Sequence, residues 1–160
     1  MRIEKNFLDI KDYQQLKQNM LSSEFPWYFN ESSLSYKNKK SQSQFIHNFF
    51  KDNVASKYIN ILDPLLKKLN AFKIYRIKAN LNPSTPNIIE TGEHTDLDDD
   101  RFLSAILFIN KCNGYCRINK TKIKSEDNKL LIFKSNQKHT GSTCTDADRR
   151  VLINLIYLIK

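Results

Sequence analysis

The feature that most constrains the fold is a series of short, strand-like segments in the second half of the chain. They cover residues 73–81, 101–110, 115–119, 129–134 and 149–159. Each is rich in β-branched, aromatic or other apolar residues and is bounded by polar turns, which is typical of antiparallel sheets. Asn113-Gly114 is a favourable two-residue turn and predicts a hairpin between the second and third segments.

The first half of the chain has helical spacing instead. Residues 9–21 carry apolar side chains at intervals of three and four, which predicts a helix with Asp9 or Asp12 near its start. A second helix is predicted over residues 54–69, with Pro64 causing a kink or a break. Helices followed by short strands predict an α+β fold, in which an antiparallel sandwich or barrel packs on helices.

The composition is that of one ordinary globular domain. The chain has 160 residues, of which 40% are hydrophobic, so it can close a core without disulfides. Only 3 glycines and 4 prolines occur, which argues against a flexible linker. We therefore expect one domain over residues 1–160, helical to about residue 70 and a barrel from about residue 71. No apolar run approaches the roughly 20 residues that span a bilayer, and the first residues do not resemble a signal peptide, so we expect a cytoplasmic protein with no membrane partner.

The formal net charge of +9 has two interpretations. Solubility is the simpler one, because the lysines are spread along the chain. An anionic partner such as nucleic acid is the alternative. The densest cluster, Lys37, Lys39 and Lys40, is too short to be a strong nucleic-acid signature. We favour the interpretation as solubility.

The cysteines do not predict a disulfide framework. There are 3 of them, an odd number, and the chain has no export signal. Cys112 and Cys116 flank Asn113-Gly114 and would face each other across the predicted hairpin. Ordinary reduced thiols are the favoured interpretation, and a functional pair is the alternative.

A candidate metal site begins at His94-Thr95-Asp96. Residues two apart in an extended segment point to the same face, so both side chains can reach one ion. His139 follows the strand predicted over 129–134 and is a candidate third ligand. Two histidines and one carboxylate form the facial triad of non-haem iron(II) oxygenases. The short motif alone is weak, since a surface turn also explains it. We interpret His47 as a structural histidine.

Arg150 is a candidate anchor for a carboxylate. It opens the last predicted strand, and a buried arginine requires an anionic partner because an unpaired buried charge is very costly. Its planar guanidinium can bind a carboxylate with two hydrogen bonds. A surface arginine at a strand end is the alternative. Alternation places Arg150, Leu152, Asn154 and Ile156 on one face and Arg149 on the other.

The order of these elements resembles the 2-oxoglutarate/iron(II) dioxygenase superfamily, and most closely the small prolyl-4-hydroxylase-like members of microbes and their viruses. The resemblance covers about residues 75–157. It rests on His94-x-Asp96, a hydrophobic strand ending Phe108-Ile109-Asn110, the turn Asn113-Gly114-Tyr115, the strand over 129–134, His139-Thr140-Gly141 and Arg150-x-x-x-Asn154. The ordered set is specific, although each piece alone is not.

The resemblance implies a double-stranded β-helix, that is, a jelly-roll barrel with the N-terminal helices packed on one sheet. It implies that His94, Asp96 and His139 bind iron(II), and that Arg150 binds the C5 carboxylate of 2-oxoglutarate, with dioxygen as the oxidant. Further candidates for co-substrate contacts are Asn154, Asn80, Lys78 and Tyr75. Tyr75 faces away from Lys78 and Asn80 on simple alternation, so not all three can point inward.

The implied activity is hydroxylation of a protein or peptide side chain. The alternatives are oxygenation of a nucleic acid or a small molecule, and an inactive metal-binding barrel used as a binding module. We expect specificity to lie in loops over residues 30–44 and 82–93. The acidic run Asp98-Asp99-Asp100 is interpreted as a solvated turn, with a rim for cationic substrates as the alternative.

Overall fold

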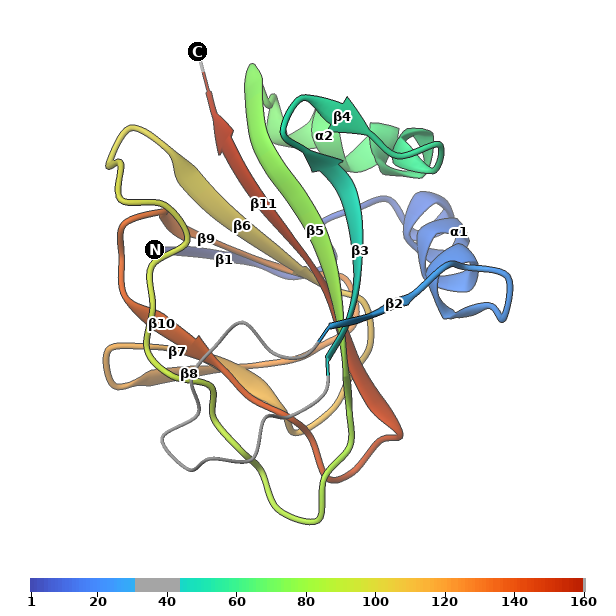
Figure 1. Cartoon of the computed structure of the whole chain (residues 1–160), viewed down its shortest axis with the longest axis vertical. Coiled ribbons are helices and arrows are strands. Elements are labelled where there is room, and N and C mark those ends of the chain that lie inside the picture. The colour runs from blue at the N-terminus through green and yellow to red at the C-terminus, as the bar shows by residue number, and fades with distance from the viewer. Residues whose placement is uncertain (31–43, 160) are drawn as a thin grey trace.

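The computed structural model describes residues 1–30 and 44–159. Within them the chain forms two α-helices, one short 3-10 helix and eleven strands (Figure 1). The elements are β1 Arg2–Glu4, α1 Ile10–Leu21, β2 Tyr28–Asn30, β3 Gln44–Lys51, β4 Val54–Ala55, η1 Ile59–Leu62, α2 Asp63–Leu69, β5 Lys73–Pro83, β6 Leu103–Phe108, β7 Tyr115–Ile118, β8 Thr121–Lys124, β9 Lys129–Lys134, β10 His139–Gly141 and β11 Arg149–Leu158.

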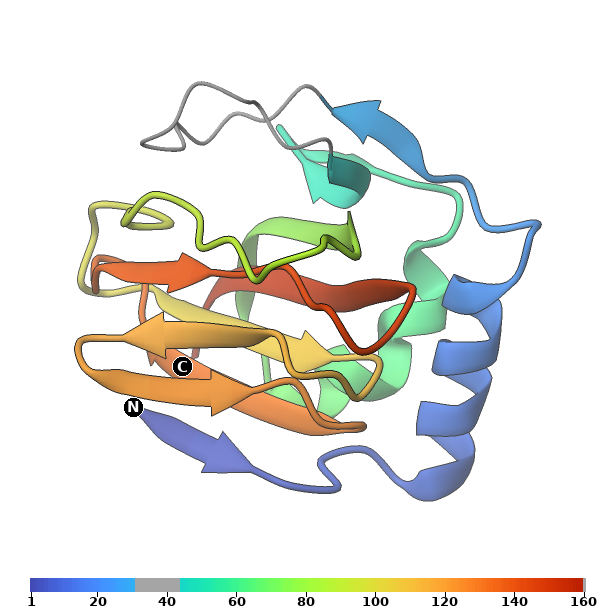
Figure 2. The ribbon, with the colours of Figure 1, turned by 90° about the horizontal axis from the view of Figure 1, so that it is seen from below.

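Two antiparallel sheets make up the barrel. The larger sheet has the order β1-β9-β6-β11-β5-β3-β2, with β4 paired to β3, and the smaller has the order β10-β7-β8. The smaller sheet lies on the side of the larger one that faces away from the helices (Figure 2). Between the sheets lies a hydrophobic cluster of Ile106, Phe108, Cys116, Ile118, Ile123, Leu131, Phe133 and Leu152. This is the expected double-stranded β-helix in an α+β chain.

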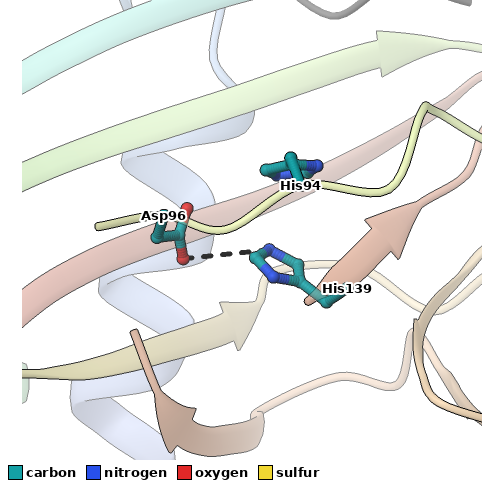
Figure 3. A group of neighbouring side chains, drawn as sticks. All are labelled: His94, Asp96 and His139. Atoms are coloured by element: carbon teal, nitrogen blue, oxygen red, sulfur yellow. Dashed lines mark ion pairs between the residues drawn. The ribbon is translucent and has the colours of Figure 1, made fainter. Parts of the chain in front are cut away.

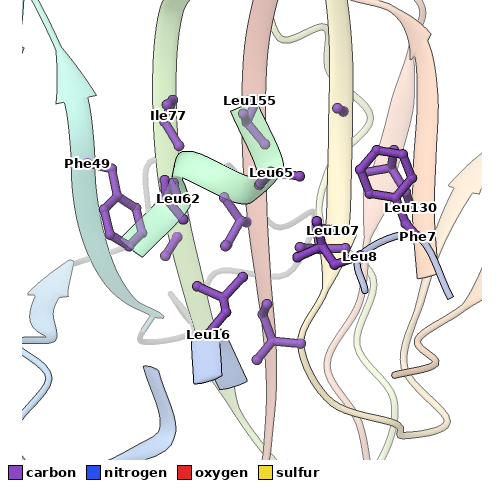
Figure 4. Packing of buried hydrophobic residues seen from close by; sticks show 14 of the residues in the cluster. Phe7, Leu8, Leu16, Phe49, Leu62, Leu65, Ile77, Leu107, Leu130 and Leu155 are labelled. Carbon is purple, nitrogen blue, oxygen red and sulfur yellow. The ribbon is translucent and has the colours of Figure 1, made fainter. Parts of the chain in front are cut away.

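The helices cover the outer face of the larger sheet. Leu16 of α1 and Leu65 of α2 are almost wholly buried against it (Figure 4). Met20 of α1 belongs to the same buried cluster. On β11, Val151 and Ile153 belong to this helix-side cluster, whereas Leu152 belongs to the cluster between the sheets. Each fully buried aliphatic side chain stabilises the fold by about 1.5 to 3 kcal/mol. Period-two alternation therefore fixes which side chains of β11 point into the barrel.

The first 70 residues are less helical than expected. The strands β1 to β4 all fall in this part, and β3 pairs with β5 inside the larger sheet. The expected boundary near residue 70 between a helical part and a barrel is therefore wrong. The signal for β3 was its aromatic, alternating sequence Phe45-Ile46-His47-Asn48-Phe49. The expected loop over 30–44, and Lys37, Lys39 and Lys40 with it, lies outside the described residues except for its two ends.

The second helix is shorter than predicted. Residues 54–55 form β4, and the helix α2 begins only at Asp63, with Pro64 in its first turn. Proline lacks the amide hydrogen that the first turn does not need, so it starts this helix and does not kink it. The first helix agrees with its prediction, because α1 begins one residue after Asp9. None of the described helices is both long and apolar enough to cross a membrane.

The hairpin predicted at Asn113-Gly114 is wrong. The strand before it, β6, pairs with β9 and β11, whereas β7 after it pairs with β8 and β10 in the other sheet. A type I′ turn needs positive φ at both central residues, and neither Asn113 nor Gly114 has it. Cys112 and Cys116 therefore do not face each other. All three cysteines are buried free thiols, and Cys112 lies beside Cys144.

Candidate metal centre and co-substrate pocket

Three side chains that could hold one metal ion meet at the open end of the barrel. His94 and Asp96 lie in the segment between β5 and β6, and His139 is the first residue of β10. Their nearest ligand atoms all lie within 4.8 Å of one another (Figure 3). The Nε2 atom of His139 is 3.8 Å from Oδ2 of Asp96. The described residues thus bring the predicted ligands together on one side of a small space.

Both histidines present the same ring nitrogen to this space. Nδ1 of His94 lies 3.0 Å from the carbonyl of Gly92, and Nδ1 of His139 lies 3.1 Å from the carbonyl of Gln137. A carbonyl only accepts hydrogen bonds, so each Nδ1 carries the proton and each Nε2 keeps its lone pair for a metal. Burial lowers the pKa of His139, which favours the neutral form that binds metals.

Asp96 is held as an ionised, oriented carboxylate. Burial alone would raise its pKa. Hydrogen bonds from Ser104 and Asn154, nearby Arg76, and the charge that His139 carries when it is protonated together lower the pKa. Ser104 Oγ donates to Oδ2 at 2.6 Å, and Nδ2 of Asn154 donates to both oxygens. Such outer hydrogen bonds fix the orientation of a ligand and raise the affinity for a metal.

Arg150 is buried without a carboxylate among the described residues that could neutralise it. Its side chain is 1% exposed, and it donates to Ser125 Oγ and to the carbonyl of Ser142. The titratable groups nearest to it are thiols, and burial raises the pKa of Cys116 to about 12 and that of Cys144 to about 11. These thiols stay neutral, so the guanidinium keeps an unmatched positive charge.

One cavity joins Arg150 to the three candidate ligands. It lies between the two sheets and is open at one end, and its empty space is about 620 Å³ when the open solvent at the mouth is included. Five buried polar atoms of the described residues have no hydrogen-bond partner, and all five belong to side chains that line this cavity. They are Arg76 Nε, Asn80 Oδ1, Thr140 Oγ1, Arg150 Nη2 and Asn154 Oδ1. Because native proteins leave few such groups unpaired, a polar ligand fits this cavity.

The residues predicted for the co-substrate pocket divide into two groups. Asn80 and Asn154 line the cavity, as Arg150 does. Tyr75 does not: its side chain is 50% exposed and contacts the edge of Phe102. The pairing of β5 with β11 is irregular here, since Arg76 pairs with Ile156 and Ile74 with Tyr157. Tyr75 is thus the extra residue of a β-bulge, with no partner on β11. Since it does not line the cavity, its prediction is wrong.

The other sequence interpretations can be placed as well. His47 lies outside the cavity and is bonded to the carbonyl of Pro26 and to Ser56 Oγ. In the acidic run, Asp99 pairs with Arg101, which lowers the pKa of Asp99 to about 2. No residue of that run lines the cavity. The alternative of an acidic rim for a cationic substrate therefore has no support from the described residues.

Some cavity residues were missed by the sequence interpretation. Arg76 points inward together with Lys78, Asn80 and Asn82, because these residues alternate along β5. That alternation was visible in the sequence and could have identified Arg76. Thr140 and Ser142 follow the ligand His139 and line the cavity too. Ser104 and Ser125 had no such signal, because only the folding of the chain brings them to Asp96 and Arg150.

Comparison with solved structures agrees with this architecture. A prolyl hydroxylase from Trichoplax adhaerens, in complex with a hypoxia inducible factor peptide, matches with a TM-score of 0.68 at 17% identity, over 98% of this chain and 82% of that one. A prolyl-4-hydroxylase from Pseudomonas putida matches with a TM-score of 0.63 at 15% identity, over 99% and 92%. This chain shares its fold with these two hydroxylases.

That fold also spans proteins of other activities. The carbocyclase SnoK from nogalamycin biosynthesis, which is alpha-ketoglutarate dependent, matches with a TM-score of 0.67 at 9% identity, over 98% of this chain and 78% of that one. No protein-family model and no curated protein matches the sequence. The fold that the resemblance implied is therefore confirmed, and the activity must be argued from the site.

Proposed function

We propose that this protein is an iron(II)- and 2-oxoglutarate-dependent dioxygenase that hydroxylates a side chain of a protein or peptide. One observation carries the proposal: His94, Asp96 and His139 line the same cavity as the buried, uncompensated Arg150. A metal that leaves coordination positions open and a fixed cation for a carboxylate are the two binding elements that 2-oxoglutarate requires.

The residues divide this task between them. His94, Asp96 and His139 would hold the iron, and Ser104 and Asn154 would keep Asp96 ionised and oriented. Arg150 would bind the distal carboxylate of 2-oxoglutarate through Nη2, which has no partner among the described residues. When bound, iron and 2-oxoglutarate supply the oxidising chemistry. The protein supplies orientation and the exclusion of water.

The assignment of a peptide substrate is supported by two of the similar structures. Both are prolyl hydroxylases, and one of them contains a peptide fragment. Here the cavity is lined near β3 and β5 by the amides of Gln44, Asn80 and Asn82. Amide side chains can donate to and accept from a peptide backbone, so this lining suits such a substrate.

The first test is an anaerobic titration of the purified protein with iron(II) and 2-oxoglutarate, followed by the visible charge-transfer band of the chelate. Wild type is expected to give the band. Arg150→Ala is expected to weaken 2-oxoglutarate binding by about tenfold or more, because a charge-assisted hydrogen bond contributes about 1.5 to 3 kcal/mol. Arg149→Ala is the matched control, since Arg149 is the exposed neighbour on the same strand.

The outcomes separate the possible activities. Equal 2-oxoglutarate affinity in Arg150→Ala and wild type would contradict the role of Arg150. No band in folded wild-type protein would contradict the metal site itself. A band without succinate formation, in oxygen and with a library of peptides, would favour the inactive binding module.

A further inference from the structure

Two cations in the cavity bind neither iron nor 2-oxoglutarate in the proposed function, although Arg76 also contacts the ligand Asp96. Arg76 and Lys78 lie two residues apart on β5 and both line the cavity. Among the described residues, Lys78 has no ion pair with any acidic side chain. Arg76 reaches only Asp96, at 3.4 Å, and its Nε is buried without a partner. Cations so placed are costly unless an anion joins them.

The charges of the proposed complex leave these cations unmatched. Iron(II) and Arg150 together carry three positive charges, and Asp96 carries one negative charge. The two carboxylates of 2-oxoglutarate balance the remaining two. The charges of Arg76 and Lys78 then remain. Asp96 cannot neutralise them, because its charge is shared with the metal.

Arg76 and Lys78 are also too far from Arg150 to share its ligand group. In the larger sheet, Arg150 pairs with Asn82, whereas Lys78 pairs with Asn154. This is four residues along each strand, or about 13 Å at 3.3 Å per residue. The two cations are instead close to Asp96, at the metal end of the cavity.

We propose that Arg76 and Lys78 form an anion subsite that holds a carboxylate or phosphate group of the substrate beside the metal. This rests on the proposed function and adds the charge of the substrate to it. The forked guanidinium of Arg76 and the ammonium of Lys78 would together bind two oxygens of such a group. A substrate without an anionic group near the reacting carbon would leave both cations unmatched.

The test uses small probes on the protein loaded with manganese(II) and saturated with 2-oxoglutarate. Manganese(II) accelerates the relaxation of protons that bind close to it, so the methyl signals of acetate, methyl phosphate and acetamide report binding near the metal. Acetamide has the shape of acetate without its charge. We expect strong relaxation of one or both anions and little of acetamide. The anion whose methyl signal relaxes faster, acetate or methyl phosphate, indicates whether the subsite prefers a carboxylate or a phosphate.

Variants of Lys78 decide whether the subsite causes this effect. In Lys78→Met the relaxation of the anions is expected to fall about tenfold or more, whereas Lys78→Arg should retain it. Lys73→Met, at the exposed start of the same strand, is the matched control. Arg76 is left intact because it touches Asp96.

Three results would overturn the proposal: equal relaxation of acetate and acetamide, unchanged anion relaxation in Lys78→Met, or a loss of 2-oxoglutarate affinity in that variant. The last result would assign Lys78 to the co-substrate. The charge-transfer band with iron(II) and 2-oxoglutarate is measured separately for every variant, and this measurement also verifies folding. If wild type lacks that band, the proposed function fails, whereas a normal band with no anion preference overturns only the subsite.

Discussion

His94 and His139 exchange two backbone hydrogen bonds, 3.0 Å from the His94 amide to the His139 carbonyl and 2.9 Å in the opposite direction. Their rings lie 4.4 Å apart between centroids. The two residues are far apart in the sequence, yet this isolated bridge holds them side by side. The spacing of the two candidate ligands is thus set by the backbone and does not require the metal.

Loss of one ligand should separate metal binding from folding. His139→Ala is expected to lower the affinity for iron(II) by more than about 100-fold, because even outer partners of a ligand contribute 10- to 100-fold. The backbone bridge to His94 remains, so the fold should persist. His47→Gln is the control, since His47 is equally buried but lies outside the cavity. Anaerobic metal titration measures the affinity, and equal affinity of His139→Ala and wild type would rule out His139 as a ligand.

Gly114 leaves the space that the Arg150 side chain occupies. A Cβ at this position would lie 2.6 Å from Cδ of Arg150 and 2.7 Å from the carbonyl oxygen of Thr143. Gly114→Ala is therefore expected to displace Arg150 and to weaken 2-oxoglutarate binding, with an overpacking cost of about 1 to 3 kcal/mol. At Gly141 the nearest atoms would be 3.8 Å away, so Gly141→Ala should cost less. Titration of both variants with 2-oxoglutarate measures the affinity. An equal loss of affinity in Gly114→Ala and Gly141→Ala would contradict the prediction.

The metal-free protein should lose stability on acidification through about pH 6.5, the ordinary histidine value. Burial lowers the pKa of both His47 and His139, so the unfolded chain binds more protons in this range. Their contribution to stability is complete above the unfolded pKa and is lost as the pH falls through the folded pKa. Urea unfolding at about pH 7.5 and about pH 5.5 measures the difference. His47→Gln should reduce this difference in the free energy of unfolding between the two pH values. An unchanged difference in that variant would show that His47 does not contribute.

Lys78 should destabilise the protein in the absence of ligands. Burial, followed by the charge of Arg76, lowers its pKa to about 8, so the folded state disfavours the charged form that is present at neutral pH. Lys78→Met is expected to raise the free energy of unfolding by about 1 to 3 kcal/mol. Lys73→Met, which removes an exposed charge, should change it little. Urea unfolding near pH 7 measures the free energy of unfolding of each variant. A lower value for Lys78→Met than for wild type would mean that Lys78 stabilises the fold.

The sequence by itself predicted what depends on local geometry. The pair His94 and Asp96 needed only a spacing of two, and the inward face of Arg150, Leu152 and Asn154 needed only the alternation of a strand. The helix α1 followed from its own apolar spacing. The order of these elements predicted an antiparallel sandwich or barrel, and it carried the resemblance that implied the double-stranded β-helix.

Only the tertiary structure decided what depends on pairing between distant segments. The bulge at Tyr75 left that residue without a partner on β11, and the passage of the chain between sheets replaced the hairpin at Asn113-Gly114. The same pairing brought Ser125 to Arg150, and Arg76 with Ser104 to Asp96. Local sequence does not encode these contacts, because register and sheet membership are chosen by the burial of whole strands against one another. The charge of the cavity, and with it the proposed charge of the substrate, became visible only in that arrangement.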